Sequence, residues 1–185
     1  MKVLILGLPR SGTTSLIRGI KDQGYTAIIE PFNNGLQNAT EREYPLKDFH
    51  KYKNLVVKNT TYQKPRSFTE QNRSWKDFNM EFMPLFDKFI FLDRRIYSDH
   101  FKSIVNLWYR VTEDETTMQA WSDEDVPKEF TNGFIAGGGA GKIHKEKEEL
   151  RALLSKFGFG NNITYYEDLY GSDREKSLSV IESWG

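Results

Sequence analysis

The sequence predicts an α/β fold in which a central, mostly parallel sheet of about five strands is flanked by helices on both faces. Short apolar runs alternate with segments of helical periodicity along the chain. Glycine or charged residues directly follow several of these runs, where the carboxyl ends of buried strands would lie. Because parallel strands need crossover connections, usually helices, we expect three layers in a single domain over residues 1–185.

The predicted strands are short and continuously apolar, a pattern typical of strands that are buried on both faces. They cover residues 2–6, 25–30, 54–57, 88–92 and 163–166. Pro31 ends the second run and Lys58 follows the third, so both runs have clear boundaries.

The predicted helices carry apolar side chains at helical spacing. They cover residues 13–20, 80–87, 98–110, 142–157 and 173–184. The third has an i, i+3, i+4, i+7 stripe that we expect to face the core, formed by Phe101, Ile104, Val105 and Trp108. Three stretches are predicted to lack regular structure: polar residues 59–78, an acidic solvated segment at 112–129, and a glycine hinge at 137–141.

The run Gly7-Leu-Pro-Arg-Ser-Gly-Thr-Thr14 has the layout of a phosphate-binding loop between a strand and a helix. Backbone N–H groups at a helix start lack internal partners and favour an anion. Thr13 stands where an ATP-binding loop has its lysine, and Arg10 supplies the positive charge instead. The sequence therefore predicts a P-loop-like fold whose anion site consists of Arg10, Ser11, Gly12, Thr13, Thr14 and Ser15.

A second anion-binding element is predicted where the fourth strand leads into a helix. Arg95 follows this strand, and Asp99 and Ser103 come next at intervals of four residues, which place side chains on one helix face. A guanidinium and a hydroxyl at such a junction can bind a phosphate. The alternative interpretation is the ordinary polar surface of an amphipathic helix.

Charge and composition exclude several classes of function. The 26 Lys and Arg residues balance the 26 Asp and Glu residues, so the overall charge does not favour nucleic-acid binding. The chain has no cysteine, which excludes disulfides, thiolate metal sites and cysteine nucleophiles. No apolar run is long enough to span a membrane, and residues 3–6 are too short for a signal peptide, so we expect a cytoplasmic protein. The oligomeric state is left open.

Taken together, these elements resemble the sulfotransferase family. Pro9-Arg-Ser-Gly-Thr-Thr14 is similar to the family's 5′-phosphosulfate loop, and Arg95, eight residues before Ser103, is similar to its 3′-phosphate element. Ile163-Thr-Tyr-Tyr-Glu-Asp-Leu169 looks like the family's late strand. Glu30-Pro-Phe32 is similar to a segment of carbohydrate sulfotransferases. The matches occur in the same order as in the family and span most of the chain.

The resemblance implies that the donor is 3′-phosphoadenosine 5′-phosphosulfate, that the acceptor is a hydroxyl, with a sugar favoured, or an amine, and that no metal is required. It implies 3′-phosphoadenosine 5′-phosphate as the product. The predicted donor-binding residues are Arg10, Ser11, Gly12, Thr13, Thr14, Ser15, Arg95 and Ser103.

Two residues at predicted strand ends are the candidates for catalysis. Glu30 is the expected general base, and Lys58 is expected to stabilise charge on the bridging oxygen of the donor. A structural salt bridge for Glu30 and an exposed position for Lys58 are the alternatives. The three histidines are expected on the surface rather than in catalysis: His50, His100 and His144.

Two further functions remain open from the sequence. Residues 89–93 end in Asp93 and look like the magnesium-binding strand of a P-loop nucleotide kinase or NTPase, although the loop lysine is missing. A degenerate, non-catalytic anion-binding module is the other alternative. It is favoured by Thr60, which stands where soluble eukaryotic sulfotransferases have a histidine, and by residues 167–185, which show no Arg-Lys-Gly loop.

Overall fold

The computed structural model describes residues 1–32, 46–112, 126–159 and 163–170, and these form an α/β fold around one five-stranded sheet. All strand pairs are parallel, and the strand order is β2-β3-β1-β4-β5. The strands are β1 (Lys2–Gly7), β2 (Thr26–Ile29), β3 (Leu55–Thr60), β4 (Lys88–Asp93) and β5 (Ile163–Tyr165). The predicted fold class and all five predicted strands are confirmed.

The described helices are α1 (Thr13–Lys21), α2 (Arg66–Glu70), α3 (Trp75–Phe82), α4 (Tyr97–Thr112), α5 (Lys128–Ala136), α6 (Gly139–Lys156) and α7 (Tyr166–Tyr170). Two 3₁₀ helices, Leu46–Lys51 and Met83–Leu85, complete the regular structure of this part of the chain. None of the helices within the described ranges is long and apolar enough to cross a membrane.

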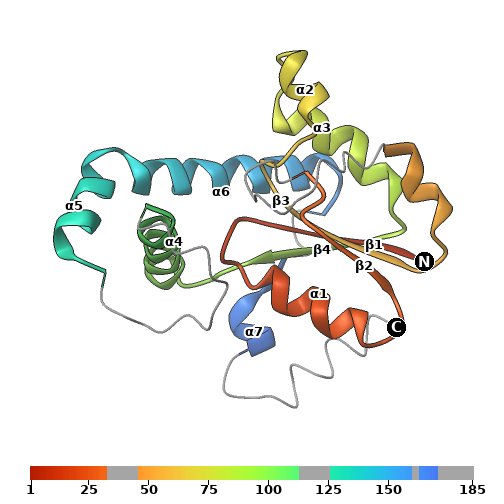
Figure 1. Ribbon diagram of the computed structural model, residues 1–185, viewed down its shortest axis with the longest axis horizontal. Coiled ribbons are helices and arrows are strands. Elements are labelled where there is room, and N and C mark those ends of the chain that lie inside the picture. Colours follow the sequence, from red (N-terminus) through yellow and green to blue (C-terminus); the bar gives the residue numbers. More distant parts are fainter. Residues whose placement is uncertain (33–45, 113–125, 160–162, 171–185) are drawn as a thin grey trace.

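Alternating side chains of the strands build two separate cores, one on each face of the sheet. On β1, Leu4 and Leu6 belong to a core that also contains Phe78 of α3 and Leu154 of α6. Their neighbours on β1 pack on the opposite face against α1 and α7, in the core of Val3, Ile5, Leu16, Ile17, Ile20, Val56, Ile90, Leu92 and Leu169. Figure 1 shows α3 and α6 above the sheet and α1 and α7 below it. Burying each such aliphatic side chain contributes about 1.5–3 kcal/mol.

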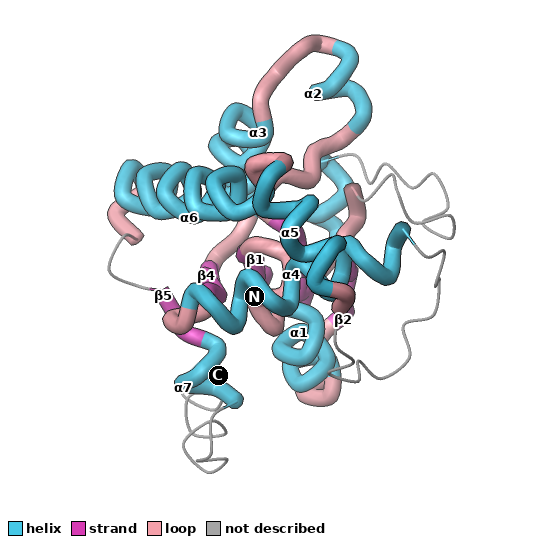
Figure 2. The backbone as a smooth tube through the Cα atoms, turned by 90° about the vertical axis from the view of Figure 1, so that its left-hand side faces the viewer, coloured by secondary structure: helices cyan, strands magenta, loops and turns pink. Residues whose placement is uncertain are grey.

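The carboxyl ends of β1, β3 and β4 meet at one edge of the sheet. Gly7 pairs with Thr60 on one side and with Leu92 on the other. A Cβ atom on Gly7 would lie 2.5 Å from the Leu92 carbonyl oxygen, so this position requires glycine. Helices α4 and α5 lie at this end of the molecule, where β1 leads into α1 (Figures 1 and 2).

Residues 59–78 were predicted to be irregular, and that prediction is wrong. They contain α2 and the start of α3. Ser74 and Asp77 form a capping box at the start of α3, a sequence signal for a helix N-terminus that the polar composition obscured. The helix predicted at 80–87 ends at Phe82, and a 3₁₀ turn containing Pro84 follows it.

Two further predictions in the second half of the chain are wrong. The expected hinge at 137–141 is a short turn, because α6 already begins at Gly139. Trp108 is 46% exposed rather than in the core, whereas Ile104 and Val105 are buried as predicted. The helix predicted at 173–184 and most of the acidic segment lie outside the described residues, although α5 occupies the end of that segment.

Candidate functional site

The loop between β1 and α1 has the backbone shape of an anion cradle. Arg10 and Gly12 have positive φ angles of 65° and 90°, and α1 begins directly afterwards at Thr13. No side chain caps this helix end, and its first turn has no acidic residue. The first N–H groups of α1, together with its dipole, therefore favour an anion at the loop. The hydroxyl of Ser11, which is fully buried, has no hydrogen-bond partner among the described residues.

The loop is covered from one side by Tyr166 at the start of α7. A Cβ atom on Gly12 would lie 2.5 Å from the Tyr166 ring, so the glycine is required by both its conformation and its neighbour. Arg94 stacks on the same ring, with its guanidinium carbon 4.2 Å from the ring centre. Tyr166 therefore connects the loop to the end of β4.

One face of α4 lies beside Arg10. The Nε atom of Arg10 donates a hydrogen bond to the Ser103 hydroxyl at 3.0 Å. Asn106 and Arg110 follow at helical spacing, and Arg110 Nε donates to Asn106 Oδ1 at 3.1 Å. Burial, and next the positive charge of Arg94, lower the pKa of Arg10, and Arg110 adds to this effect. The loop is therefore surrounded by several cations.

Lys58, two residues before the end of β3, forms an ion pair with Glu30, which directly follows β2. Lys58 is only 3% exposed, so the alternative of an ordinary exposed lysine is wrong. Gln63 Nε2 donates to the second carboxylate oxygen of Glu30 at 3.1 Å, and Gln63 Oε1 accepts from the Thr60 N–H at 3.3 Å. The ion pair that the sequence offered as the alternative for Glu30 is therefore present.

The charge of Lys58 is coupled to the loop. Burial, and then the nearby charge of Arg10, lower the pKa of Lys58 to about 8. The contacting Glu30 carboxylate favours the charged ammonium, so Lys58 is a cation at neutral pH. A carboxylate held by an ammonium and an amide is a weak base, because both contacts stabilise its charged form.

The structure does not place Arg95 beside Ser103. Arg95 donates two hydrogen bonds to Asp168, at 3.0 and 2.8 Å, and its guanidinium lies over the Tyr165 ring. Glu167 accepts the backbone N–H of Arg95 at 2.9 Å. The Tyr-Glu-Asp-Leu motif thus ties α7 to the start of α4, while Ser103 joins the loop through Arg10.

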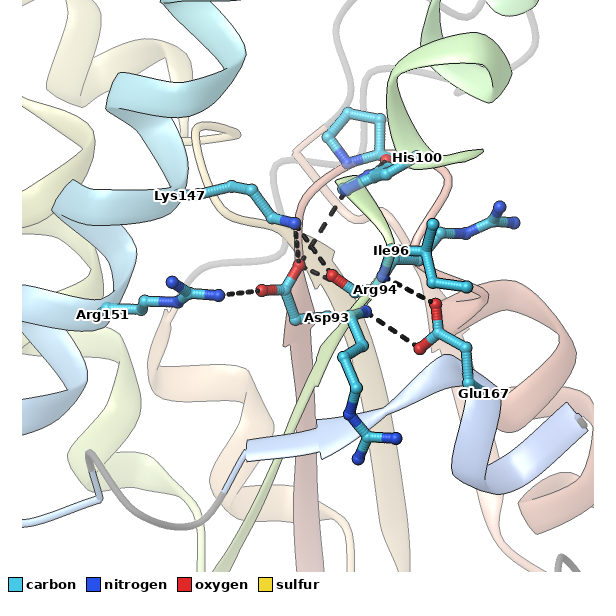
Figure 3. A network of polar contacts seen from close by, with 9 residues as sticks. Asp93, Arg94, Ile96, His100, Lys147, Arg151 and Glu167 are labelled. Atoms are coloured by element: carbon cyan, nitrogen blue, oxygen red, sulfur yellow. Dashed lines mark hydrogen bonds and ion pairs between the residues drawn. The ribbon is translucent and has the colours of Figure 1, made fainter. Parts of the chain in front are cut away.

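Asp93 at the end of β4 lies in a network of polar contacts with α6 (Figure 3). Lys147 Nζ is 3.0 Å from Asp93 Oδ1, and an Arg151 nitrogen is 3.1 Å from Oδ2. Asp93 and Lys147 are both 6% exposed, so this is a buried ion pair. The carboxylate that a magnesium site would need is occupied by cations of α6. No cluster of potential metal ligands occurs within the described residues.

His100 was expected on the surface, and this prediction is wrong, because the side chain is fully buried. Its Nε2 atom lies 2.8 Å from the Pro9 carbonyl oxygen of the loop. Burial lowers the pKa of His100 to about 4, although the Pro9 contact opposes the shift. The other two histidines are exposed, as predicted.

The structure therefore brings together the loop residues, Ser103, Lys58 and Glu30, and leaves Arg95 in a different contact. Sequence reasoning missed Gln63, His100 and Arg110. His100 lies three residues before Ser103 and Arg110 seven residues after it, and this helical spacing is the signal that could have found two of them. Comparisons of the chain with protein-family models, curated proteins and solved structures found no match.

Proposed function

We propose that this protein binds 3′-phosphoadenosine 5′-phosphosulfate and transfers its sulfuryl group to a hydroxyl or an amine. The observation that carries the proposal is the cationic surround of the β1–α1 loop. Arg10 lies in the loop and interacts electrostatically with Lys58 and Arg110, which come from β3 and α4. A phosphosulfate brings negative charge to this position, and charge-assisted hydrogen bonds from Arg10 and the loop N–H groups would hold it.

Lys58 and Glu30 have separate roles in the proposed reaction. The acceptor atom forms a bond to sulfur while the bond from sulfur to the bridging oxygen breaks, and that oxygen keeps the electron pair. The Lys58 ammonium stabilises the resulting charge, and Glu30 takes the proton of the acceptor. Because the two side chains neutralise each other without donor, attraction of Lys58 to the donor would weaken their contact and make Glu30 more basic.

The kinase alternative has less support in the geometry. Its metal-binding residue, Asp93, projects toward α6 and contacts Lys147 and Arg151. The loop also has Thr13 at the position where an ATP-binding loop has its lysine. A carbohydrate acceptor and a cytoplasmic location remain what the sequence favours.

Binding of the donor product tests the proposal. Isothermal titration with 3′-phosphoadenosine 5′-phosphate, and separately with ATP and magnesium, is compared for the wild type, Arg10→Gln and Arg18→Gln. Arg18 is an exposed arginine in the last turn of α1 and serves as the matched control. We expect the wild type and Arg18→Gln to bind the bisphosphate alike, and Arg10→Gln to bind about tenfold more weakly or worse.

The other outcomes contradict the proposal in different ways. Binding of ATP with magnesium but not of the bisphosphate would contradict the sulfotransferase proposal and favour a kinase. Binding of the bisphosphate without any transfer from the phosphosulfate to a panel of sugars and amines would favour the non-catalytic module. A bisphosphate affinity that Arg10→Gln leaves unchanged would place the ligand away from the loop.

A further inference from the structure

The β1–α1 loop begins with a tight turn whose backbone conformation is unfavourable for one of its residues. The Ser11 N–H donates to the Leu8 carbonyl at 3.3 Å, which closes a β-turn over Pro9 and Arg10. Proline at the second position and a positive φ of 65° at the third are the features of a type II turn. That third position favours glycine, but this chain has Arg10 there.

A different turn would suit these residues better. In a type I turn the central peptide is flipped, and the third residue has a negative φ that any L residue adopts readily. The flip reverses the direction of the Pro9 carbonyl and of the Arg10 N–H on the opposite edge of the same peptide. An interaction outside the turn must therefore select the observed orientation.

His100 provides that interaction. Its Nε2 atom is 2.8 Å from the Pro9 carbonyl oxygen, and because a carbonyl only accepts, Nε2 carries the proton. The ring is fully buried, so water does not compete with the Pro9 carbonyl for the Nε2 proton. Ser103, three residues later on the same face of α4, accepts the hydrogen bond from the Arg10 side chain. One helix face therefore holds both the backbone and the side chain of the turn.

The far side of the His100 ring faces the ion-pair network at the end of β4. Nδ1 lies 3.9 Å from Asp93 Oδ1, and that carboxylate is held by Lys147 and Arg151 (Figure 3). Lys147 also donates to the Arg94 carbonyl at 2.9 Å. Nδ1 has no hydrogen-bond partner among the described residues, so the network at the end of β4 lies behind the ring and leaves the Pro9 carbonyl as the hydrogen-bond partner of His100.

We propose that His100 is a positioning residue that locks the Pro9–Arg10 peptide in the orientation needed for anion binding. With the Pro9 carbonyl held toward α4, the Arg10 N–H points away from that helix. The identity of the bound anion rests on the proposed function, whereas the effect of His100 on the turn conformation does not.

The test compares three variants in binding and in the conformation of the turn. His100→Phe keeps a buried ring but removes the donor, His100→Gln restores an N–H at the Nε2 position, and His144→Phe changes an exposed histidine of α6 as the matched control. The readouts are the affinity for 3′-phosphoadenosine 5′-phosphate and the amide resonances of Arg10 and Ser11. The histidine tautomer in the wild type is read from ring ¹⁵N shifts.

We expect His100→Phe to bind the bisphosphate about tenfold more weakly or worse and to shift both amide resonances. His100→Gln is expected to recover most of the affinity, and His144→Phe to match the wild type. Unchanged affinity and resonances in His100→Phe, or an Nδ1–H tautomer in the wild type, would overturn the inference. If His100→Phe does not fold, the tautomer and His100→Gln decide. A wild type that does not bind the bisphosphate defeats the proposed function, and the amide resonances then decide the role of His100.

Discussion

Lys58 and Asp93 lie in the carboxyl-terminal halves of two strands on either side of β1, yet their charges have different surroundings. Lys58 projects toward the α1 face, where it meets one carboxylate, Glu30, and the positive charge of Arg10. Asp93 projects toward the α6 face, where two cations hold it, Lys147 and Arg151. In the first region the positive charge of Arg10 is additional to the Lys58–Glu30 pair and lies at the loop, whereas in the second region both oxygens of the Asp93 carboxylate are engaged by cations of α6.

Strand alternation explains this difference. On β3, Lys58 has the same parity as Val56, which belongs to the core under α1. On β4, Asp93 has the same parity as Phe91, which belongs to the core under α6. Being at the same edge of a sheet therefore does not bring two polar residues into one site, because each must also face the same layer.

The largest expected effect comes from removing the buried charge of Asp93. Asp93→Asn leaves Lys147 and Arg151 without their carboxylate, and we expect the free energy of unfolding to fall by about 3–5 kcal/mol. Asp168→Asn breaks an exposed pair with Arg95 and is expected to cost less than about 1 kcal/mol. Urea denaturation measures both. Equal costs would show that the Asp93 carboxylate contributes no more to stability than the exposed carboxylate of Asp168.

Gly12→Ala tests how closely the loop is covered. The alanine must adopt a φ of 90° and meets the Tyr166 ring, so we expect a loss of about 2–4 kcal/mol in the free energy of unfolding. Gly24→Ala is the control, because Gly24 has a φ of 89° but nothing lies within 4 Å of the added atom. Denaturation of both variants isolates the ring contact. A cost for Gly12→Ala no larger than that for Gly24→Ala would contradict close packing of Tyr166 on the loop.

Acid should lower the free energy of unfolding through His100, which lies between the two regions. Burial lowers its pKa to about 4, so between about pH 6.5 and 4 the unfolded chain binds a proton that the native state does not. Stability is therefore complete above pH 6.5 and falls as pH falls, by about 2 kcal/mol between pH 7 and 5. The groups that face the ring are Asp93 and Arg94 of the β4 end and Lys147 of α6.

Denaturation at pH 7 and pH 5 of the wild type and His100→Gln separates this contribution from that of the carboxyl groups, which are common to both. The variant is expected to lose about 2 kcal/mol less than the wild type over this range. The same loss in both proteins would mean that His100 is not held neutral.

Glu30→Gln should have the smallest effect on binding. The variant removes the carboxylate beside Lys58 but leaves the loop and Arg10 in place, so the affinity for 3′-phosphoadenosine 5′-phosphate is expected to change by less than about threefold. Sulfuryl transfer should be abolished, because the amide cannot take a proton. Titration measures the binding, and release of the bisphosphate from the donor measures the transfer. Retained turnover would remove Glu30 from the mechanism.

Local sequence patterns were sufficient to predict the strands of the sheet and the position of the loop. Five continuous apolar runs became five parallel strands, and the two glycines of the loop occupy positions that only glycine fits. The partners of Arg95 could not be predicted in this way. Its spacing to Ser103 is correct for a helix, but Asp168, far along the chain, forms its hydrogen bonds.

The sequence by itself determined which apolar runs form the strands and that a glycine-bracketed loop leads from the first strand into a helix, because strand burial and helix starts depend on neighbouring residues. The tertiary structure decided which polar side chains share a site. It buried His100 against Pro9, joined Glu30 to Lys58 and directed Asp93 to α6. These contacts join segments that are distant along the chain, and they depend on strand order and on the face of the sheet, which no short sequence pattern records.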